Sequence, residues 1–240
     1  MNTPHSPAPP VESWLDAHTR RRPAGGGCGI DVASQRADDL DERCLTFLDT
    51  RFMHNQGTRP SALDLACGQG GQALRMAAAG VLVTAVDQHD HETTIQGEAA
   101  RRRVWRPPVF VRADFRALPE NLAGAPFDVI VCQRAIHYLP YGEAVTAVQS
   151  WAHYLKPGGH LFLSASGLAS ELGHGYPHGD RPVTARFAPL ARDMAERHNI
   201  QAPVCLYEAL DLVDLLHAAG YGIAEVFLSP FGNVKVVAFV

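Results

Sequence analysis

The chain has 240 residues, 46% of them hydrophobic, which is enough for one α/β domain with a single substantial core. Its formal net charge of −4 gives no overall attraction to nucleic acid or to an anionic membrane, and no apolar run is long enough to span a bilayer. Five cysteines without CxxC spacing predict neither a disulfide framework nor a zinc knuckle, so we expect a cytoplasmic protein with no nucleic-acid or membrane partner.

The N-terminal part is rich in proline, arginine and glycine, and this composition predicts a flexible segment over residues 1–30. A short helix is expected within it at Val11–His18. Residues 31–240 are expected to form one domain. Its first helix is predicted over Asp38–His54, where apolar residues recur at helical intervals, acids come early and bases come late.

The stretch Leu63–Gly80 predicts a strand, a tight turn and a helix. In the turn, Gly68 and Gly70 let the backbone bend and let a ligand approach without meeting a Cβ atom. The turn fits the loose dinucleotide fingerprint G-x-G-x-x-G/A, which by itself favours an NAD(P)-dependent oxidoreductase. Asp64 favours a different ligand, because a carboxylate just before the turn would repel a pyrophosphate and suits a ligand with a cationic end.

A family resemblance begins with the run DLACGQG at residues 64–70, which is similar to motif I of the class I S-adenosylmethionine-dependent methyltransferases. The resemblance implies a Rossmann-like α/β fold with a seven-stranded, mostly parallel sheet, an antiparallel C-terminal strand and helices on both faces. It implies S-adenosylmethionine as the cofactor. A helix such as Asp38–His54 crosses the cofactor pocket in this family, which places Arg51, Phe52 and His54 near the methionine end; a packing role explains them equally well.

The next two predicted strands, Val81–Val86 and Val109–Ala113, are each followed by an acid. Asp87 follows Gly68 at the spacing of an acid that meets ribose hydroxyls, although NAD-binding proteins share this feature. The resemblance implies that Asp114 meets the adenine amino group while Phe115 covers a ring face; a simple strand-end turn is the alternative. With Gln133 closing the site, the full implied cofactor set is Asp64, Ala66, Gly68, Gly70, Asp87, Gln88, Asp114, Phe115 and Gln133.

A fourth strand, predicted over Phe127–Cys132, delivers Arg134, His137 and Tyr138 to its carboxyl end, where open α/β sheets place their chemistry. We expect His137 to act as a general base and Tyr138 to orient it. His174, on a long segment over residues 166–208 that we predict to be a substrate lid, is a second candidate. For any one of these histidines a structural role is an equally good explanation.

The C-terminal part contains the feature that best separates methyltransferases from dinucleotide-binding folds, an antiparallel pair of strands after the last helix. An L-K-P-G-G turn before the fifth strand is also similar to a late element of the family. The predicted elements are helices over Gly142–Leu155, Pro189–His198 and Leu210–Ala219, a turn over Lys156–Gly159, and strands over His160–Ala165, Ile223–Leu228 and Val234–Val240.

The resemblance implies an enzyme that moves a methyl group from S-adenosylmethionine to an O, N or S atom of a small molecule by in-line displacement. The protein then mainly aligns and desolvates the acceptor. We expect no metal, because His89-Asp90-His91 and the histidines between His174 and Asp180 lack the context of a known site. The alternatives are an NAD(P)-dependent oxidoreductase, a catalytically silent binding module, and a protein or RNA methyltransferase with Arg101–Arg106 beside the pocket. A monomer or homodimer is expected.

Overall fold

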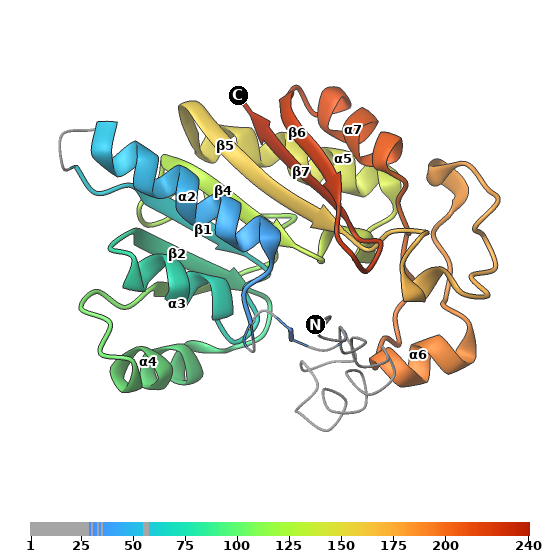
Figure 1. Ribbon diagram of the computed structural model, residues 1–240, viewed down its shortest axis with the longest axis horizontal. Coiled ribbons are helices and arrows are strands. Elements are labelled where there is room, and N and C mark those ends of the chain that lie inside the picture. The colour runs from blue at the N-terminus through green and yellow to red at the C-terminus, as the bar shows by residue number, and fades with distance from the viewer. Residues whose placement is uncertain (1–28, 30, 33, 35, 55–57) are drawn as a thin grey trace, which may run out of the picture.

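The computed structural model describes residues 29, 31, 32, 34, 36–54 and 58–240 (Figure 1). The segment predicted to be flexible, with its helix at Val11–His18, lies outside the described residues except for Gly29. A seven-stranded sheet has the order β3-β2-β1-β4-β5-β7-β6. Its strands are β1 Ser61–Leu65, β2 Leu82–Asp87, β3 Val109–Arg112, β4 Phe127–Gln133, β5 Leu155–Ala165, β6 Gly222–Leu228 and β7 Val234–Phe239.

The pairing of the strands confirms the predicted fold class. Strands β1 to β5 pair in parallel wherever they are neighbours, and β7 pairs antiparallel with both β5 and β6. The strand order reverses at β1, which lies between β2 and β4. In open α/β sheets such a reversal opens a crevice outside the carboxyl ends of the strands, where ligands bind.

Helices cover both faces of the sheet (Figure 1). Side chains of β1 alternate between the two cores: Leu63 and Leu65 belong to one, and Ala62 belongs to the other. Asp64 therefore faces the same side as Ala62. That side carries α2 Asp39–His54, α3 Gly71–Ala78 and α4 Glu92–Arg101, whereas α5 Tyr141–Trp151 and α7 Ala209–Ala218 pack on the other.

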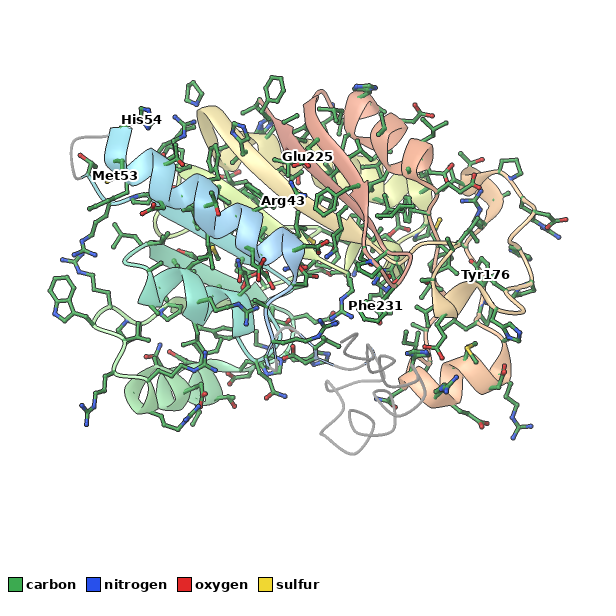
Figure 2. The ribbon with its side chains drawn as sticks, viewed as in Figure 1. Arg43, Met53, His54, Tyr176, Glu225 and Phe231 are labelled. Carbon is green, nitrogen blue, oxygen red and sulfur yellow. The ribbon has the colours of Figure 1, made fainter. Side chains whose placement is uncertain are left out.

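The segment 166–208, predicted to be a lid, leaves the sheet after β5 and forms a small cluster of its own that includes Leu172, Tyr176 and Val204 (Figures 1 and 2). The Tyr176 hydroxyl donates to the carbonyl of Val204 at 2.6 Å and also to that of Arg186. Its helix, α6 Arg192–His198, is shorter than predicted. The segment is thus a packed element at the carboxyl side of the sheet.

The L-K-P-G-G stretch differs from the prediction. Helix α5 ends at Trp151, a short 3-10 turn follows over Ala152–Tyr154, and β5 already begins at Leu155. Leu155 pairs with Phe127 before a register shift, and the ladder resumes further along. Residues 156–159 are left out of the pairing with β4, so the predicted turn is a bulge within a strand.

Helix α2 is oriented so that its first turn, and not its last, approaches the site. At the far end Arg51 donates to the carbonyl of Gly158 near the start of β5, and Phe52 is 38% exposed. The Nδ1 atom of His54 lies 2.7 Å from the carbonyl of Thr50 in its own helix. Figure 2 shows His54 at that distant end. The interpretation that Arg51, Phe52 and His54 approach the methionine end is therefore wrong.

The turn from β1 into α3 uses left-handed backbone at Ala66, Gly68 and Gly70, with φ of 53°, 53° and 81°. A Cβ atom on Gly70 would lie 2.7 Å from a side-chain carbon of Ile95 in α4. Gly70 is therefore required by its φ and by helix packing, and the interpretation that it also leaves room for a ligand stays a prediction. Ala66 adopts its left-handed conformation although it carries a Cβ atom.

Replacing Ala66 by glycine should stabilise the protein. The left-handed region costs a non-glycine residue about 1–2 kcal/mol, and glycine avoids this cost. The larger conformational entropy that glycine loses on folding offsets part of the gain. We expect Ala66→Gly to raise the free energy of unfolding by up to about 1 kcal/mol in urea titrations. As the matched control, Ala73→Gly inside α3 should lower it by at least about 1 kcal/mol. A loss of stability in Ala66→Gly would contradict this account of the turn.

Candidate active site

The end of β2 is tied directly to the glycine turn. One oxygen of Asp87 accepts the backbone N–H of Gly68 at 2.9 Å, and the other accepts the N–H of His89 at the same distance. An ionised carboxylate has about four acceptor positions, so both oxygens of Asp87 retain capacity for hydroxyl donors. The predicted ribose-binding acid therefore lies at the turn, where the resemblance implies it.

A second carboxylate, from Asp31, lies on the other side of the turn. Its Oδ2 accepts the N–H of Gln69 at 2.9 Å, and its Oδ1 accepts the N–H of Ser34 at 3.0 Å. A Cβ atom on Gly68 would come within 2.9 Å of Asp31 Oδ2, so glycine is what admits this contact. Sequence reasoning missed Asp31, because it lies in a segment without periodicity, far from the turn along the chain.

A buried polar cluster lies beneath the turn. Asp41, in the first turn of α2, pairs with Arg75 of α3 at 3.0 Å and accepts a hydrogen bond from the side-chain amide of Gln133. Burial, followed by the charge of Asp41, raises the pKa of Asp64 to about 8. Burial also raises the pKa of Asp41 to about 6, against the attraction of Arg75. Asp64 is therefore protonated at neutral pH in this structure.

This arrangement suits a cofactor with a cationic end. The Oδ2 atom of Asp64 is buried and has no hydrogen-bond partner among the described residues. Asp31, Asp41, Asp64 and Asp87 surround the turn, whereas Arg75 is already paired with Asp41. The carboxylates of Asp31 and Asp87 attract an ammonium or sulfonium group and repel a pyrophosphate, and a bound cation would favour the ionised form of Asp64. S-adenosylmethionine therefore fits these residues better than a dinucleotide does.

The remaining residues of the predicted cofactor set follow β2 and β3, which pair in register up to Asp87 and Arg112. Gln88 is exposed, and its carbonyl accepts a hydrogen bond from Arg112 at 3.1 Å. A hydrogen bond from Arg116 at 2.5 Å lowers the pKa of Asp114. The ring of Phe115 packs against Trp151, with centroids 5.9 Å apart. The contacts of Gln88, Asp114 and Phe115 with an adenine therefore stay predictions.

On the acceptor side, His137 is buried at 2% exposure in a short 3-10 helix after β4. Its Nε2 lies 3.5 Å from the hydroxyl of Ser166, and its Nδ1 has no hydrogen-bond partner among the described residues. Burial, with a smaller contribution from Arg134, lowers the pKa of His137 to about 3. The imidazole is thus neutral at physiological pH, with a free nitrogen but low basicity.

The other two predicted catalytic residues lie in different surroundings. The ring of Tyr138 lies against that of His137, with the centroids 4.3 Å apart and the planes tilted by 37°, and it packs against the cluster of the segment 166–208. His174 is exposed on a turn of that segment. The structure therefore brings Tyr138 to His137, and among the described contacts none joins His174 to either ring.

Arg134 occupies the centre of this region in an unusual backbone conformation. Its φ is +48°, and its N–H is held by the carbonyl of Ser164 at 3.0 Å and by the Ser164 hydroxyl at 3.1 Å. Non-glycine residues in the left-handed region cluster at functional sites when their surroundings enforce the strain. The position of Arg134 after β4 was evident from the sequence, but nothing in the sequence assigned it a role.

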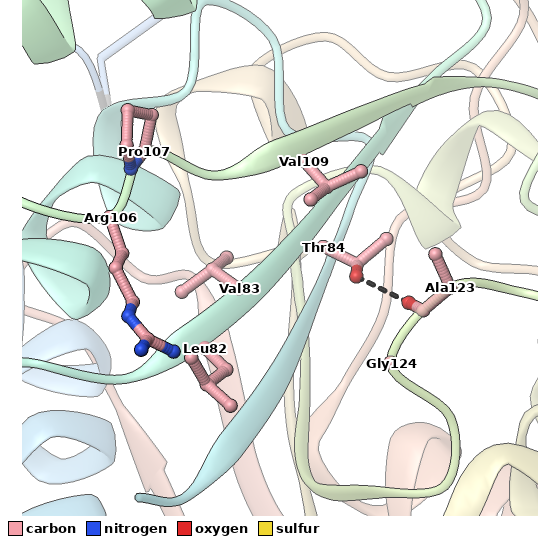
Figure 3. A pocket seen from close by; sticks show the side chains of 8 residues that line it. All are labelled: Leu82, Val83, Thr84, Arg106, Pro107, Val109, Ala123 and Gly124. Carbon is pink, nitrogen blue, oxygen red and sulfur yellow. Dashed lines mark hydrogen bonds between the residues drawn. The ribbon is translucent and has the colours of Figure 1, made fainter.

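Two cavities lie away from the carboxyl ends of the strands. One, of about 220 Å³, is lined by Leu82 and Val109, the first residues of β2 and β3, together with Arg106 and Gly124 (Figure 3). The other, of about 650 Å³, lies between Phe47 of α2 and Glu225 of β6. Within the described ranges, no group of three potential ligands is placed to hold a metal ion. Likewise, no helix of the described chain has the length and apolarity to cross a membrane.

Comparison with known proteins supports this assignment of the turn. A family model described as a methyltransferase domain matches residues 62–159. The chain is 35% identical over 104 residues to a ubiquinone biosynthesis O-methyltransferase of Xylella fastidiosa, covering 42% of this chain and 40% of that protein. The chain therefore spans about two-fifths of the length of this curated relative.

Two solved structures share the fold. A S-adenosylmethionine-dependent methyltransferase of Clostridium acetobutylicum superposes with a TM-score of 0.62 at 12% identity, covering 87% of this chain and 94% of that one. The 1,6-didemethyltoxoflavin-N1-methyltransferase of Burkholderia thailandensis superposes with a TM-score of 0.61 at 18% identity, covering 95% of this chain and 85% of that one. The motif, the strand order and the family model agree: residues 62–159 match a methyltransferase domain, and the chain has the fold of these solved methyltransferases.

Proposed function

We propose that this chain is an S-adenosylmethionine-dependent methyltransferase acting on a small molecule, with oxygen as the first candidate for the acceptor atom and nitrogen or sulfur as alternatives. The observation that carries the proposal is the group of carboxylates around the glycine turn, including the unpartnered oxygen of Asp64. The name of the Xylella relative supports an oxygen acceptor. The proposal disfavours an NAD(P)-dependent oxidoreductase, because these acids would repel a pyrophosphate.

The bound cofactor supplies a methyl group that its sulfonium has already activated. Asp87 would accept the ribose hydroxyls, and the backbone from Ala66 to Gly70 would form the floor of the site. Asp31 and Asp64 would face the cationic end of the cofactor. Gln133, held by Asp41, would close the site on the side of β4. Gln88, Asp114 and Phe115 would border the adenine.

On the acceptor side, His137 would accept a hydrogen bond from the group to be methylated. Its neutral imidazole can receive a proton, and burial excludes water from the exchange. Tyr138, which lies against His137, would fix the direction of the ring. The segment 166–208 would cover the acceptor, with His174 at its outer surface.

Removing the ribose-binding carboxylate should abolish cofactor binding. Asp87→Asn loses the charge that attracts the hydroxyls and weakens the bonds to Gly68 and His89. A hydrogen bond to a charged group contributes about 1.5–3 kcal/mol. Loss of two such bonds to the ribose hydroxyls therefore predicts an affinity for S-adenosylhomocysteine, measured by calorimetry, that is at least roughly 100-fold weaker. Asp90→Asn, which alters an exposed acid three residues along, is the control and should bind normally. Normal binding by Asp87→Asn would mean that another residue holds the ribose.

Cofactor binding should release a proton near pH 7. Asp64 retains its proton up to a pKa of about 8, and a bound cation favours the ionised form, so affinity should increase as pH rises from about 6 to about 8. Calorimetry of S-adenosylhomocysteine in phosphate and in Tris should therefore give binding enthalpies that differ with the ionisation enthalpy of the buffer. The difference should shrink in Asp64→Asn. Equal enthalpies for the unmodified chain would show that Asp64 does not change its ionisation.

Loss of the His137 imidazole should slow turnover without weakening cofactor binding. A positioned general base contributes about 100-fold or more to the rate of proton transfer. Because His137 is weakly basic, we expect its contribution to lie at the lower end of that range, and His137→Ala should reduce kcat by about 100-fold. The dissociation constant of S-adenosylhomocysteine should stay unchanged. His153→Ala, at an exposed histidine, provides the control. Unchanged kcat in His137→Ala would assign His137 a packing role only.

A further inference from the structure

A basic surface lies at the amino ends of β2 and β3, whereas the glycine turn lies at the carboxyl ends. Leu82 and Val109, the first residues of these strands, line the cavity of about 220 Å³ together with Arg106 (Figure 3). The guanidinium carbons of Arg106 and Arg59 lie 4.7 Å and 5.0 Å from the centre of the ring of Trp105. These five residues therefore form one surface. We call it the Trp105 patch and include in it the arginines at the end of α4, which are Arg101, Arg102 and Arg103.

The arginines of the patch carry more positive charge than nearby carboxylates neutralise. Glu98 pairs with Arg101 and, at 2.9 Å, with Arg102. The other three arginines of the patch form no ion pair with any carboxylate of the described residues. The whole chain has a formal net charge of −4, so the patch is a local positive area on an acidic protein. The expectation of no membrane partner rested on the net charge, which averages over this area.

Arg103 has a backbone conformation that usually belongs to glycine. Its φ is +56°, and its N–H donates to the carbonyl of Ala100 at 3.1 Å, while the N–H of Val104 donates to that of Ala99 at 2.9 Å. This pair of hydrogen bonds ends many helices, and glycine is the commonest residue at the left-handed position. Strained residues of this kind cluster at functional sites. An exposed arginine therefore occupies, two residues before Trp105, a position where glycine would be less strained.

Large apolar side chains of the patch are exposed beside these charges. Trp105 is 73% exposed, Val109 is 53% exposed and Leu82 is 39% exposed. The cavity between Leu82 and Val109 is open, so the described part of the protein does not cover them. Exposed apolar side chains that gather at one place and are surrounded by polar groups mark interaction surfaces. The partner must therefore offer both negative charge and apolar material.

We propose that the Trp105 patch docks this protein on the surface of an anionic lipid bilayer. Each kind of side chain has a counterpart there. The indole ring of Trp105 suits the level of the headgroups, the guanidinium groups match the lipid phosphates, and Leu82 and Val109 can enter the boundary of the acyl chains. A nucleic acid would match the arginines and the indole, but it offers no apolar phase to the two aliphatic side chains. The docking does not depend on methyl transfer.

Docking through this patch would leave the cofactor site in water. Strand β2 runs from Leu82 in the patch to Asp87 at the glycine turn. Six residues of a strand span about 16 Å, so the turn would lie at least that far from the headgroups. The cofactor and the acceptor would therefore enter from the aqueous side. The alternative of an RNA methyltransferase with Arg101–Arg106 beside the pocket is disfavoured, because the patch and the turn lie at opposite ends of β2.

Sedimentation of the full chain with lipid vesicles tests the docking. One kind of vesicle contains equal parts of phosphatidylglycerol and phosphatidylcholine, and the neutral kind contains phosphatidylcholine alone. The variants are the double exchange of Arg103→Gln with Arg106→Gln and the single exchange Trp105→Phe. As the matched control, Arg181→Gln with Arg192→Gln removes two exposed charges from the segment 166–208. Circular dichroism shows whether each variant is folded, which we expect because all the exchanged side chains are exposed.

We expect the unmodified chain to bind the anionic vesicles, to ignore the neutral ones and to be released by concentrated salt. One arginine near such a surface contributes about 5-fold to affinity, so the loss of Arg103 and Arg106 should weaken binding by about 25-fold. The control variant should bind as the unmodified chain does. Tryptophan emission should shift to the blue on binding, because Trp105 leaves water, whereas Trp151 is already fully buried. The shift should be smaller in Trp105→Phe.

Several outcomes would overturn the docking. They are binding of neither kind of vesicle, equal binding of both kinds, and full binding by the variant that lacks Arg103 and Arg106. Equal weakening in the control variant would show that the patch has no special part in binding. A single-stranded RNA of 20 nucleotides, titrated in parallel, covers the other class of partner. Binding of this RNA that requires Arg103 and Arg106, without binding of vesicles, would make the patch a nucleic-acid surface and the proposal wrong.

Discussion

The buried carboxyl groups of Asp64 and Asp41 impose the constraint on which the site depends. Two acids in one low-dielectric volume cannot both ionise without compensation, which here comes from Arg75 and Gln133. These residues come from β1, α2, α3 and β4. The cluster therefore joins elements from separate parts of the chain beneath the glycine turn and places there a carboxyl group, that of Asp64, which a bound cation would help to ionise. A cationic ligand above it would relieve the constraint that the fold creates.

The strand order brings the groups on both sides of the crevice together. Because β1 lies between β2 and β4, the ends of these strands face a common space. The carboxylates of Asp31 and Asp87 lie on one side, and neutral His137 follows β4 on the other. The acids would hold the cationic end of the cofactor, and the neutral histidine would face the acceptor. The proposed chemistry needs little more, because in-line transfer depends mainly on alignment and the exclusion of water.

The sequence was sufficient for the sheet, the glycine turn and Asp87, because each leaves a local pattern: apolar runs, positive-φ glycines and a fixed spacing. Tertiary packing decided the rest. Gly70 is explained by Ile95 of the next helix, and the L-K-P-G-G stretch is a bulge between Leu155 and His160, which both pair with β4. The contacts of Asp31 and Asp41 depend on partners far away in the chain, and no periodicity signals such contacts. For the same reason the direction of α2, and with it the place of Arg51, was not evident from the sequence.

The central claim is that an acid-lined glycine turn holds a nucleoside with a cationic end, the ammonium group that S-adenosylmethionine and S-adenosylhomocysteine share. Side-by-side calorimetric titrations of the full chain with S-adenosylhomocysteine and with NADH test it most directly. The account predicts saturable one-to-one binding of S-adenosylhomocysteine and no detectable heat from NADH, because the carboxylates repel a pyrophosphate. Tight binding of NADH with no response to S-adenosylhomocysteine would contradict the account.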